Sequence, residues 1–241
     1  MRLAGPGERP MALNNIQAIV FDVDGTLYPQ RPLRMRLLLE LALQFAKKPV
    51  RQLRTLKVLR AYRKAHELAR TNRSDDTAQR LQLCIASELS GEQPEFVERS
   101  VSEWFQRRPL RHLKSVLYPD LVALLRQAKE HGIRLGVLSD YPAVDKLSAM
   151  GIIDYFDAIV SSHDECVGYL KPHPRGLQTC LRRLDVQPGQ SLYVGDRADV
   201  DLPCAASAHT QFVLFGKAPN HAQCVSVSSY NQLSQALGFQ S

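Results

Sequence analysis

The stretch IQAIVFDVDGTLYP, residues 16–29, is an apolar run that ends abruptly in two carboxylates. Its first half has the length and composition of a buried β-strand. Side chains two positions apart on an extended chain project to the same side, so Asp22 and Asp24 can approach one small ligand together. Gly25 lets the backbone turn sharply directly after them. An ordinary strand followed by a D-G turn fits the same letters, because a short D-x-D-G motif is weak evidence by itself.

Two carboxylates this close favour a cation between them, because like charges resist ionising together. Carboxylate oxygens are the hard ligands that Mg²⁺ binds, and this ion takes only one or two protein carboxylates and keeps several waters. Asp22 and Asp24 are therefore the first candidates for a magnesium site.

The 241 residues have the composition of an ordinary globular protein, with 44% apolar and 23% charged residues. No apolar run approaches the roughly 18 to 20 residues that a membrane-spanning helix needs, so we expect no membrane partner. Residues 1–13 contain no apolar core of a secretory signal, and we expect a disordered leader there, with Met11 as an alternative start. Five cysteines without a C-x-x-C pair favour reduced thiols and a cytoplasmic location.

Basic residues exceed acidic ones by 31 to 24, and the excess is concentrated in one part of the chain. Residues 31–73 hold thirteen Lys or Arg against only Glu40 and Glu67. Such a span favours an anionic substrate or partner nearby. A solvated helix face carries the same pattern, so both interpretations stay open.

Residues 31–114 are predicted to form a helical cap domain. Apolar residues at helical spacing indicate four amphipathic helices between residues 33 and 107, the third of which is expected to pack through Leu81, Ile85 and Leu89. Because this segment separates the first strand from all the others, it is an insertion whose apolar faces are expected to pack on each other.

From residue 118 onward, predicted helices alternate with short apolar strands. Helices are expected at residues 120–130, 144–150, 175–184, 201–207 and 231–237, and strands at residues 133–138, 158–161, 191–194 and 211–215. This alternation predicts an α/β fold, a Rossmann-like parallel sheet with helices on both faces. We assign the core domain to residues 14–30 and 115–241. Ligands of such sheets bind outside the carboxyl ends of the strands.

Polar side chains gather where these strands end. They are Asp22 and Asp24 after the first strand, Ser139 after the second, Lys171 in a later turn, and Asp196, Asp199 and Asp201 after a further strand, with Asp199 expected at the surface. Acids at apolar strand ends are costly unless they are paired or bound to metal. Together the set supplies what phosphoryl transfer needs: a nucleophile, an acid/base, a metal site and donors for the phosphoryl oxygens.

Four of these segments resemble, in order, the motifs of the haloacid dehalogenase superfamily of aspartate-nucleophile hydrolases. They are DVDGT at residues 22–26, Ser139, KPHP containing Lys171, and GDRADVD at residues 195–201. The insertion between the first two motifs is similar to the C1-capped subclass, in its phosphoglycolate-phosphatase-like branch. The resemblance covers residues 16–215 and departs from the common pattern at Asp140, where many relatives have asparagine.

The resemblance implies a division of work among the acids. Asp22 would attack phosphorus and form an aspartyl-phosphate. Asp24 would protonate the leaving alcohol and then activate water, while its backbone carbonyl reaches the metal. Asp196 would complete the Mg²⁺ site with Asp22 and Asp24, and Asp201 would hold that shell in place.

The resemblance also implies a binding site for the phosphoryl group. Ser139 would donate to a phosphoryl oxygen, and Lys171 would neutralise charge between that group and the nucleophile. Gly25 and Thr26 of the first motif would lie beside the phosphoryl oxygens.

The implied function is a Mg²⁺-dependent phosphatase that acts on a small phosphorylated metabolite beneath the cap. An acid at position 24 favours phosphate esters, because an alkoxide leaving group needs a proton. A phosphomutase of the same fold is the alternative. A binding protein that uses the basic cap for nucleic acid or an acidic partner is less favoured, because only Phe45 and Tyr62 could serve as a stacking platform in the basic span.

Overall fold

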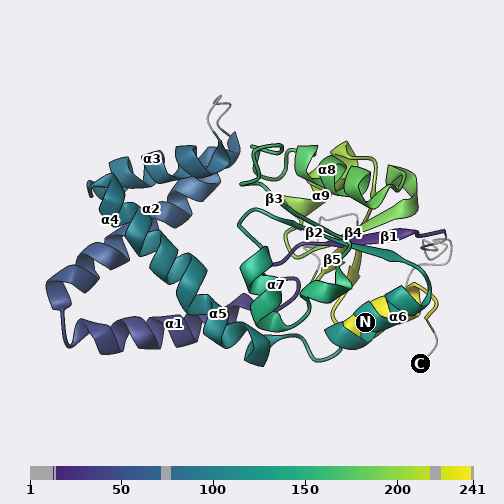
Figure 1. The fold of residues 1–241 in the computed structure, drawn as a ribbon, viewed down its shortest axis with the longest axis horizontal. Coiled ribbons are helices and arrows are strands. Elements are labelled where there is room, and N and C mark those ends of the chain that lie inside the picture. Colours follow the sequence, from purple (N-terminus) through teal and green to yellow (C-terminus); the bar gives the residue numbers. More distant parts are fainter. Residues whose placement is uncertain (1–12, 14, 72–76, 218–223, 240–241) are drawn as a thin grey trace.

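The computed structural model describes residues 13, 15–71, 77–217 and 224–239. In this part of the chain one sheet of six parallel strands has the order β3-β2-β1-β4-β5-β6 (Figure 1). The strands are β1 (Ala18–Phe21), β2 (Arg134–Ser139), β3 (Ala158–Ser161), β4 (Ser191–Gly195), β5 (Gln211–Phe215) and β6 (Val225–Val227). The predicted α/β fold with a parallel sheet is confirmed. Strand β6 was not predicted, because three residues are too few to show a period.

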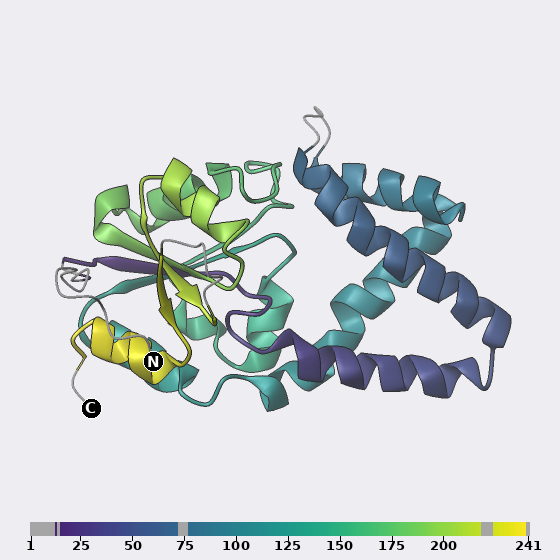
Figure 2. The same cartoon turned by 180° about the vertical axis from the view of Figure 1, so that it is seen from behind.

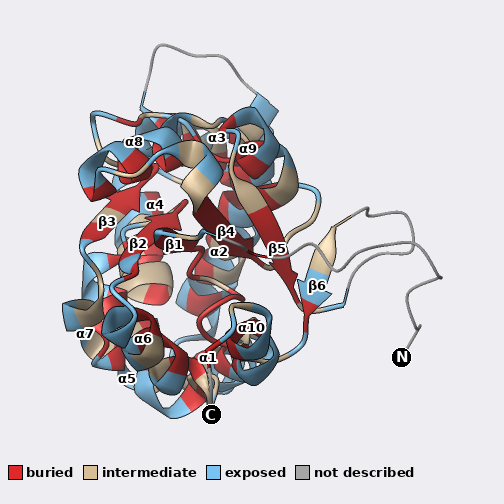
Figure 3. Cartoon of the chain, turned by 90° about the vertical axis from the view of Figure 1, so that its right-hand side faces the viewer, coloured by how far each residue is buried: buried red, intermediate tan, exposed pale blue. Residues whose placement is uncertain are grey.

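Helices cover both faces of the sheet, which lies between them in Figure 3. On one face pack α6 (Leu121–Glu130), α7 (Val144–Met150) and α10 (Tyr230–Ala236), and on the other α8 (Arg175–Leu184) and α9 (Asp201–Ser207). Alternation along β1 explains the two layers, because Ile19 and Phe21 belong to the first core and Ala18 and Val20 to the second. Because β1 is buried on both faces, its sequence is a continuous apolar run.

A second group of helices stands to one side of the sheet and lies, in the chain, between β1 and β2 (Figures 1 and 2). They are α1 (Gln30–Phe45), α2 (Pro49–Thr71), α3 (Ala78–Ser90), α4 (Pro94–Val101), the π-helical η1 (Ser102–Arg107) and α5 (Arg108–Leu113). The four predicted helices are present. The predicted bundle ended at residue 107, but the chain remains helical beyond it, because α5 follows η1 directly.

The buried face of α3 agrees with the prediction in part, because Leu81 and Ile85 are half-buried and pack against neighbouring hydrophobic clusters. The helix buries Ala78, Gln82, Ala86 and Ser90, whereas Leu89 is 40% exposed. Small side chains bring α3 close to α2, and the buried Gln82 amide is satisfied there: its Nε2 donates to the Tyr62 carbonyl (3.2 Å) and its Oε1 contacts His66 Nδ1 (3.2 Å). The spacing of apolar residues in the sequence could not predict this polar contact.

Short 3₁₀ turns complete the described elements: η2 (Lys114–Val116), η3 (Ile153–Tyr155) and η4 (Pro188–Gln190). Of the predicted leader only Leu13 is described, and it is buried in the core. No described helix is both long and apolar enough to cross a bilayer.

Candidate active site

Three neighbouring strands of the sheet deliver the acidic side chains to one edge. Strand β1 pairs with β2 on one side and β4 on the other, so Phe21 lies between Val137 and Val194. The residues that follow these strands are therefore adjacent, and the Asp22 amide donates to the Val194 carbonyl (2.9 Å). Parallel register thus brings together groups that are far apart in the sequence.

Lys171 lies at the centre of a buried ion network. Its ammonium donates to Asp22 Oδ1 (2.7 Å), Asp201 Oδ1 (2.7 Å) and the Tyr193 hydroxyl (3.0 Å). Burial alone would lower the pKa of Lys171, but Asp201 and Asp22 outweigh it and hold that pKa well above its ordinary value. The ammonium is therefore a permanent positive charge beside Asp22.

Asp22 keeps an unusually basic carboxylate in spite of this lysine. Burial, with a further contribution from Asp201, raises its pKa to about 6 against the lowering effect of Lys171. The Thr26 hydroxyl donates to the second carboxylate oxygen, Asp22 Oδ2 (3.1 Å). Both oxygens are thus oriented by neighbouring donors.

Asp22, Asp196 and Asp201 form a group of carboxylates that could hold a metal. One oxygen from each lies within 4.8 Å of the others. Burial, followed by repulsion from Asp22 and Asp201, raises the pKa of Asp196 to about 8. A hard divalent cation would relieve this repulsion, and carboxylate oxygens from two of these residues, with water, would suit Mg²⁺.

Gly25 is required by the closeness of this group. Its φ is +114°, and a Cβ atom built on it would lie 2.0 Å from Asp196 Oδ2. Any other residue would displace Asp196 as well as strain the turn.

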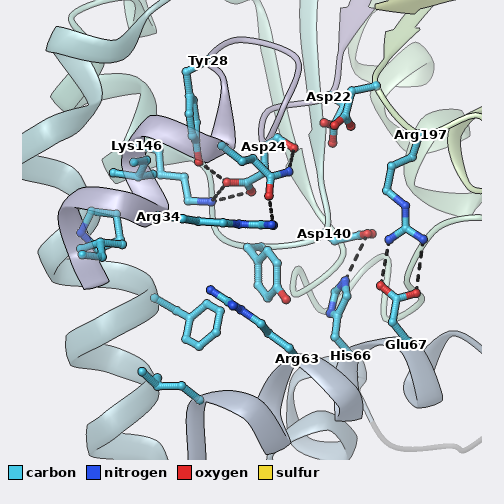
Figure 4. A pocket seen from close by; sticks show the side chains of 18 of the residues that line it. Asp22, Asp24, Tyr28, Arg34, Arg63, His66, Glu67, Asp140, Lys146 and Arg197 are labelled. Atoms are coloured by element: carbon cyan, nitrogen blue, oxygen red, sulfur yellow. Dashed lines mark hydrogen bonds and ion pairs between the residues drawn. The ribbon is translucent and has the colours of Figure 1, made fainter. Parts of the chain in front are cut away.

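Asp24 has a different environment, although it is only two residues from Asp22. Both of its oxygens accept from the Lys146 ammonium (2.7 and 2.6 Å), and the Tyr28 hydroxyl donates to Oδ1 (Figure 4). Burial would raise the pKa of Asp24, but Lys146 outweighs it and the pKa is lowered. The Asp24 side chain is outside the metal-compatible group, and its backbone carbonyl accepts from Gln30 Nε2.

The predicted phosphate-binding residues Ser139, Thr26 and Gly25 are buried. Ser139 is fully buried, and its Oγ accepts from the Tyr141 amide (3.1 Å), which leaves its own proton available. Ser139, Thr26 and Gly25 are not among the described residues that line the cavity above Asp22. Asp199 is exposed, as predicted, and pairs with Arg197 (2.6 Å).

A cavity of about 390 Å³ lies above the carboxylates, between the sheet edge and the cap helices. Its floor contains Asp22, Asp24 and Lys171. Its wall on the cap side is apolar and basic, formed by Leu33, Leu37, Leu41, Leu59, Trp104 and Phe105 with Arg34, Arg63 and Arg70. Figure 4 shows Arg34 and Arg63 extending into the space in front of Asp24. No described carboxylate pairs with either of these two arginines.

Asp140 joins the cap to the core. Its carboxylate accepts from the Lys171 amide (3.0 Å) and pairs with two residues of α2, Arg70 (2.8 Å) and His66 (3.5 Å). Burial would raise the pKa of Asp140, but Lys171, His66 and Arg70 hold it far below its ordinary value. An asparagine here could not carry the charge that faces Arg70.

Three residues that contact the predicted site residues were not predicted from the sequence: Tyr28, Lys146 and Arg70. Tyr28 lies four positions after Asp24, and that short spacing was a usable signal. Lys146 and Arg70 offered none, because each contacts its partner across the fold and no local spacing links the two residues.

Comparisons with known proteins identify the family of the chain. A sequence model described as haloacid dehalogenase-like hydrolase matches residues 16–209. The chain is 30% identical over 197 residues to a glyceraldehyde 3-phosphate phosphatase of Methanopyrus kandleri, covering 78% of each chain. It is 31% identical over 137 residues to a phosphoglycolate phosphatase of Yersinia pseudotuberculosis, covering 53% of this chain and 58% of the relative.

Solved structures show the same fold. A 2-haloacid dehalogenase from Pseudomonas syringae superposes with a TM-score of 0.65 at 21% identity, over 92% of this chain and 98% of the other. An HAD phosphatase from Thermococcus onnurineus superposes with a TM-score of 0.58 at 23% identity, over 93% and 99%. These structures confirm the fold, and the sequence matches confirm the prediction of a haloacid dehalogenase-type phosphatase. The chain belongs to the haloacid dehalogenase-like hydrolase family.

Proposed function

We propose that the chain is a Mg²⁺-dependent phosphatase that hydrolyses a small phosphate monoester through an aspartyl-phosphate on Asp22. The observation that carries this proposal is the environment of Asp22: Lys171 holds one carboxylate oxygen at 2.7 Å and Thr26 the other at 3.1 Å. A buried carboxylate whose pKa is raised to about 6 is ionised at neutral pH and more basic than a free one, which suits a nucleophile.

The reaction then has two steps. A carboxylate oxygen of Asp22 attacks phosphorus, the bond from phosphorus to the ester oxygen breaks, and Asp24 gives its proton to the leaving alkoxide. In the second step Asp24 takes a proton from water, the oxygen of that water attacks phosphorus, and the bond to Asp22 breaks to release inorganic phosphate. Lys171 remains protonated throughout and neutralises the phosphoryl oxygens.

Asp24 must be protonated for the first step, although its pKa is lowered in the free enzyme. The arrival of a phosphoryl dianion raises the pKa of a neighbouring carboxylate, because like charges disfavour ionisation. Tyr28 and Lys146 hold the Asp24 side chain in one orientation, so the proton is delivered at a fixed position.

Asp22 and Asp196 would hold Mg²⁺, together with the Asp24 backbone carbonyl, and Asp201 would orient the shell. The ion supplies charge neutralisation for the phosphoryl group when bound. Ser139 is proposed as a further donor to a phosphoryl oxygen, beside Gly25 and Thr26.

The cavity suggests the kind of ester. Arg34 and Arg63 face it without a carboxylate partner, and burial and the neighbouring Arg34 lower the pKa of Arg63. An anionic group of the substrate besides the transferred phosphoryl would neutralise them. We place that group at the cap, which we assign to residues 31–114 over a core of residues 14–30 and 115–241. A cytoplasmic location is proposed from the five free thiols.

The test is release of phosphate from p-nitrophenyl phosphate and from a panel of phosphorylated metabolites. Activity should require Mg²⁺, vanish with EDTA and fall by roughly 10⁴-fold or more in Asp22→Asn. Full activity in that variant would overturn the mechanism. A phosphomutase would instead convert a sugar phosphate to its isomer without net phosphate release.

A further inference from the structure

Exposed apolar side chains are concentrated on one small part of the cap. Of the eleven large apolar residues exposed in the described chain, seven lie within nineteen consecutive positions. They are Met35, Leu38, Leu39, Leu43, Phe45, Val50 and Leu53, each 40% to 72% exposed. Single exposed leucines are ordinary, but a contiguous group marks an interaction surface.

Helix α1 is apolar on two sides, and only one side has a partner. Leu33, Leu37 and Leu41 recur every four residues and line the cavity. A second stripe with the same spacing, Met35, Leu39 and Leu43, is exposed. The turn from α1 to α2 lies at the end of the molecule remote from the sheet (Figures 1 and 2), and Val50 follows it as the second residue of α2.

The same segment is basic and offers no free acid. Arg31, Lys47, Lys48 and Arg51 are exposed, and no ion pair of the described residues includes them. Glu40 is the one acid between residues 31 and 54, and it is held by Arg108 and His112, both at 2.6 Å. Leucines and cations therefore face solvent together.

The combination of exposed apolar and basic side chains distinguishes between three possible partners. A second copy docked across a twofold axis would place this segment against itself, and the segment has no free acid to neutralise Lys47, Lys48 and Arg51. Nucleic acid would match the charge but not the stripe of Met35, Leu39 and Leu43, and Phe45 is the one exposed aromatic ring between residues 31 and 54 on which a base could stack. An anionic lipid surface matches both, because headgroups attract the cations and the acyl boundary accepts the apolar side chains.

We propose that the start of α2 and the exposed face of α1, defined by Met35, Leu39, Leu43, Val50 and Leu53, dock on an anionic lipid surface. The absence of a spanning helix concerns insertion through a bilayer and leaves this peripheral contact open. Leu38 is exposed and also lines the cavity, so the docking surface adjoins the cavity wall.

The test is co-sedimentation of the full chain with vesicles of phosphatidylcholine, with or without phosphatidylglycerol. We expect binding to the phosphatidylglycerol vesicles that weakens with salt. The double variant Leu39→Glu, Leu43→Glu should lose at least about tenfold in binding, since it places charge in the apolar stripe. The matched control is Leu89→Glu on α3, an exposed leucine outside the surface, which should bind as wild type does.

Hydrolysis of p-nitrophenyl phosphate serves as the folding control, because none of the substituted leucines lines the cavity. The proposal is overturned if the folded protein ignores phosphatidylglycerol vesicles, or if Leu39→Glu, Leu43→Glu binds them as wild type does. It is also overturned if light scattering shows a dimer that these changes dissociate, or if a gel shift shows nucleic-acid binding that Lys47→Glu, Lys48→Glu removes while vesicle binding is absent. Vesicle binding without phosphatase activity would leave this proposal standing and remove the proposed function.

Discussion

Two carboxylate–lysine pairs lie two residues apart in this molecule and have opposite properties. Lys171 binds Asp22 at 2.7 Å, and Lys146 binds Asp24 at 2.6 Å. Yet the pKa of Asp22 is raised to about 6, whereas the pKa of Asp24 is lowered. Burial raises both, so the distance to a lysine does not explain the difference.

The difference comes from the other neighbours. Lys171 is shared between two acids, because Asp201 takes a second hydrogen bond of 2.7 Å from the same ammonium. Lys146 gives two hydrogen bonds to Asp24 alone, and Tyr28 adds a third. The positive charge of Lys171 is therefore too small for the two carboxylates Asp22 and Asp201, and a bound cation could supply the rest. The charge of Asp24 is already neutralised by Lys146.

Lys171→Met breaks the first pair and should have the largest effect. It leaves Asp22 and Asp201 buried without a cation, which costs about 3 to 5 kcal/mol of folding stability. It also removes the charge that faces the phosphoryl group, so we expect kcat to fall by roughly 10³-fold. Urea unfolding and kcat measured on the same preparation check both effects.

The matched control for this variant is Lys129→Met. Lys129 pairs with Asp157 at a similar distance, 2.6 Å, but both side chains are more than a third exposed. Its loss should cost less than about 1 kcal/mol. Equal destabilisation by the two substitutions would show that burial of the Lys171 network contributes nothing.

Lys146→Met breaks the second pair and should have a smaller effect. The side chain keeps its volume, and Asp24 stays in place through Tyr28. Without the ammonium the pKa of Asp24 rises and its orientation loosens, so kcat should fall roughly ten- to a hundredfold. The alkaline limb of the kcat profile, on which the protonated form of Asp24 is lost, should move to higher pH. A loss as large as that of Lys171→Met would mean that the two lysines do equivalent work.

The pH dependence of stability separates the two pairs further. The pKa values of Asp22 and Asp196 are raised from 3.8 to about 6 and about 8, so their contribution to stability is present below 3.8 and is lost as pH rises through those values. The pKa of Asp24 is lowered, so its contribution is present above 3.8 and is lost as pH falls below that value.

In EDTA, therefore, the free energy of unfolding contributed by Asp22 and Asp196 should decline between pH 3.8 and about 8. Added Mg²⁺ should reverse much of the decline, because it binds the ionised carboxylates. Asp196→Asn should flatten the curve and remove the response to Mg²⁺. A stability that rises over this range in EDTA and ignores Mg²⁺ would contradict the metal site.

Local sequence signals were enough to predict most helices and strands around the parallel sheet. Helix Val144–Met150 ends at Gly151 in the left-handed conformation, and helix Arg175–Leu184 is followed by Pro188 and Gly189; both were predicted with their observed bounds. The carboxyl-end rule for parallel strands was enough to bring Asp22 and Asp196 together.

The cation partners could not be predicted in this way. Lys146 is 122 residues from Asp24, and Arg70 is 101 residues from Lys171, whose carbonyl it contacts. The spacing of apolar residues predicts that Arg70 and Lys146 are on helices. Which residue each side chain contacts depends on how its helix packs against the rest of the molecule. The exposed stripe of α1 was missed for the same reason, since its periodicity equals that of the buried stripe.

The smallest effect we expect concerns the second contact between cap and core. Arg197 pairs with Glu67 of α2 at 2.8 Å, and both side chains are more than a third exposed. Arg197→Gln should change the free energy of unfolding by less than about 1 kcal/mol. Because the pair crosses from core to cap, the same change should raise KM about twofold by loosening the closed arrangement. The control Arg54→Gln breaks a pair with Glu92 inside the cap, in which Arg54 is 49% and Glu92 12% exposed, and should leave KM unchanged. If Arg197→Gln also leaves KM unchanged, the remaining contacts of the cap with the core, among them the buried pair of Arg70 with Asp140 and the hydrogen bond from the Ala78 amide to the Gly168 carbonyl (3.2 Å), are enough to hold the cap in place.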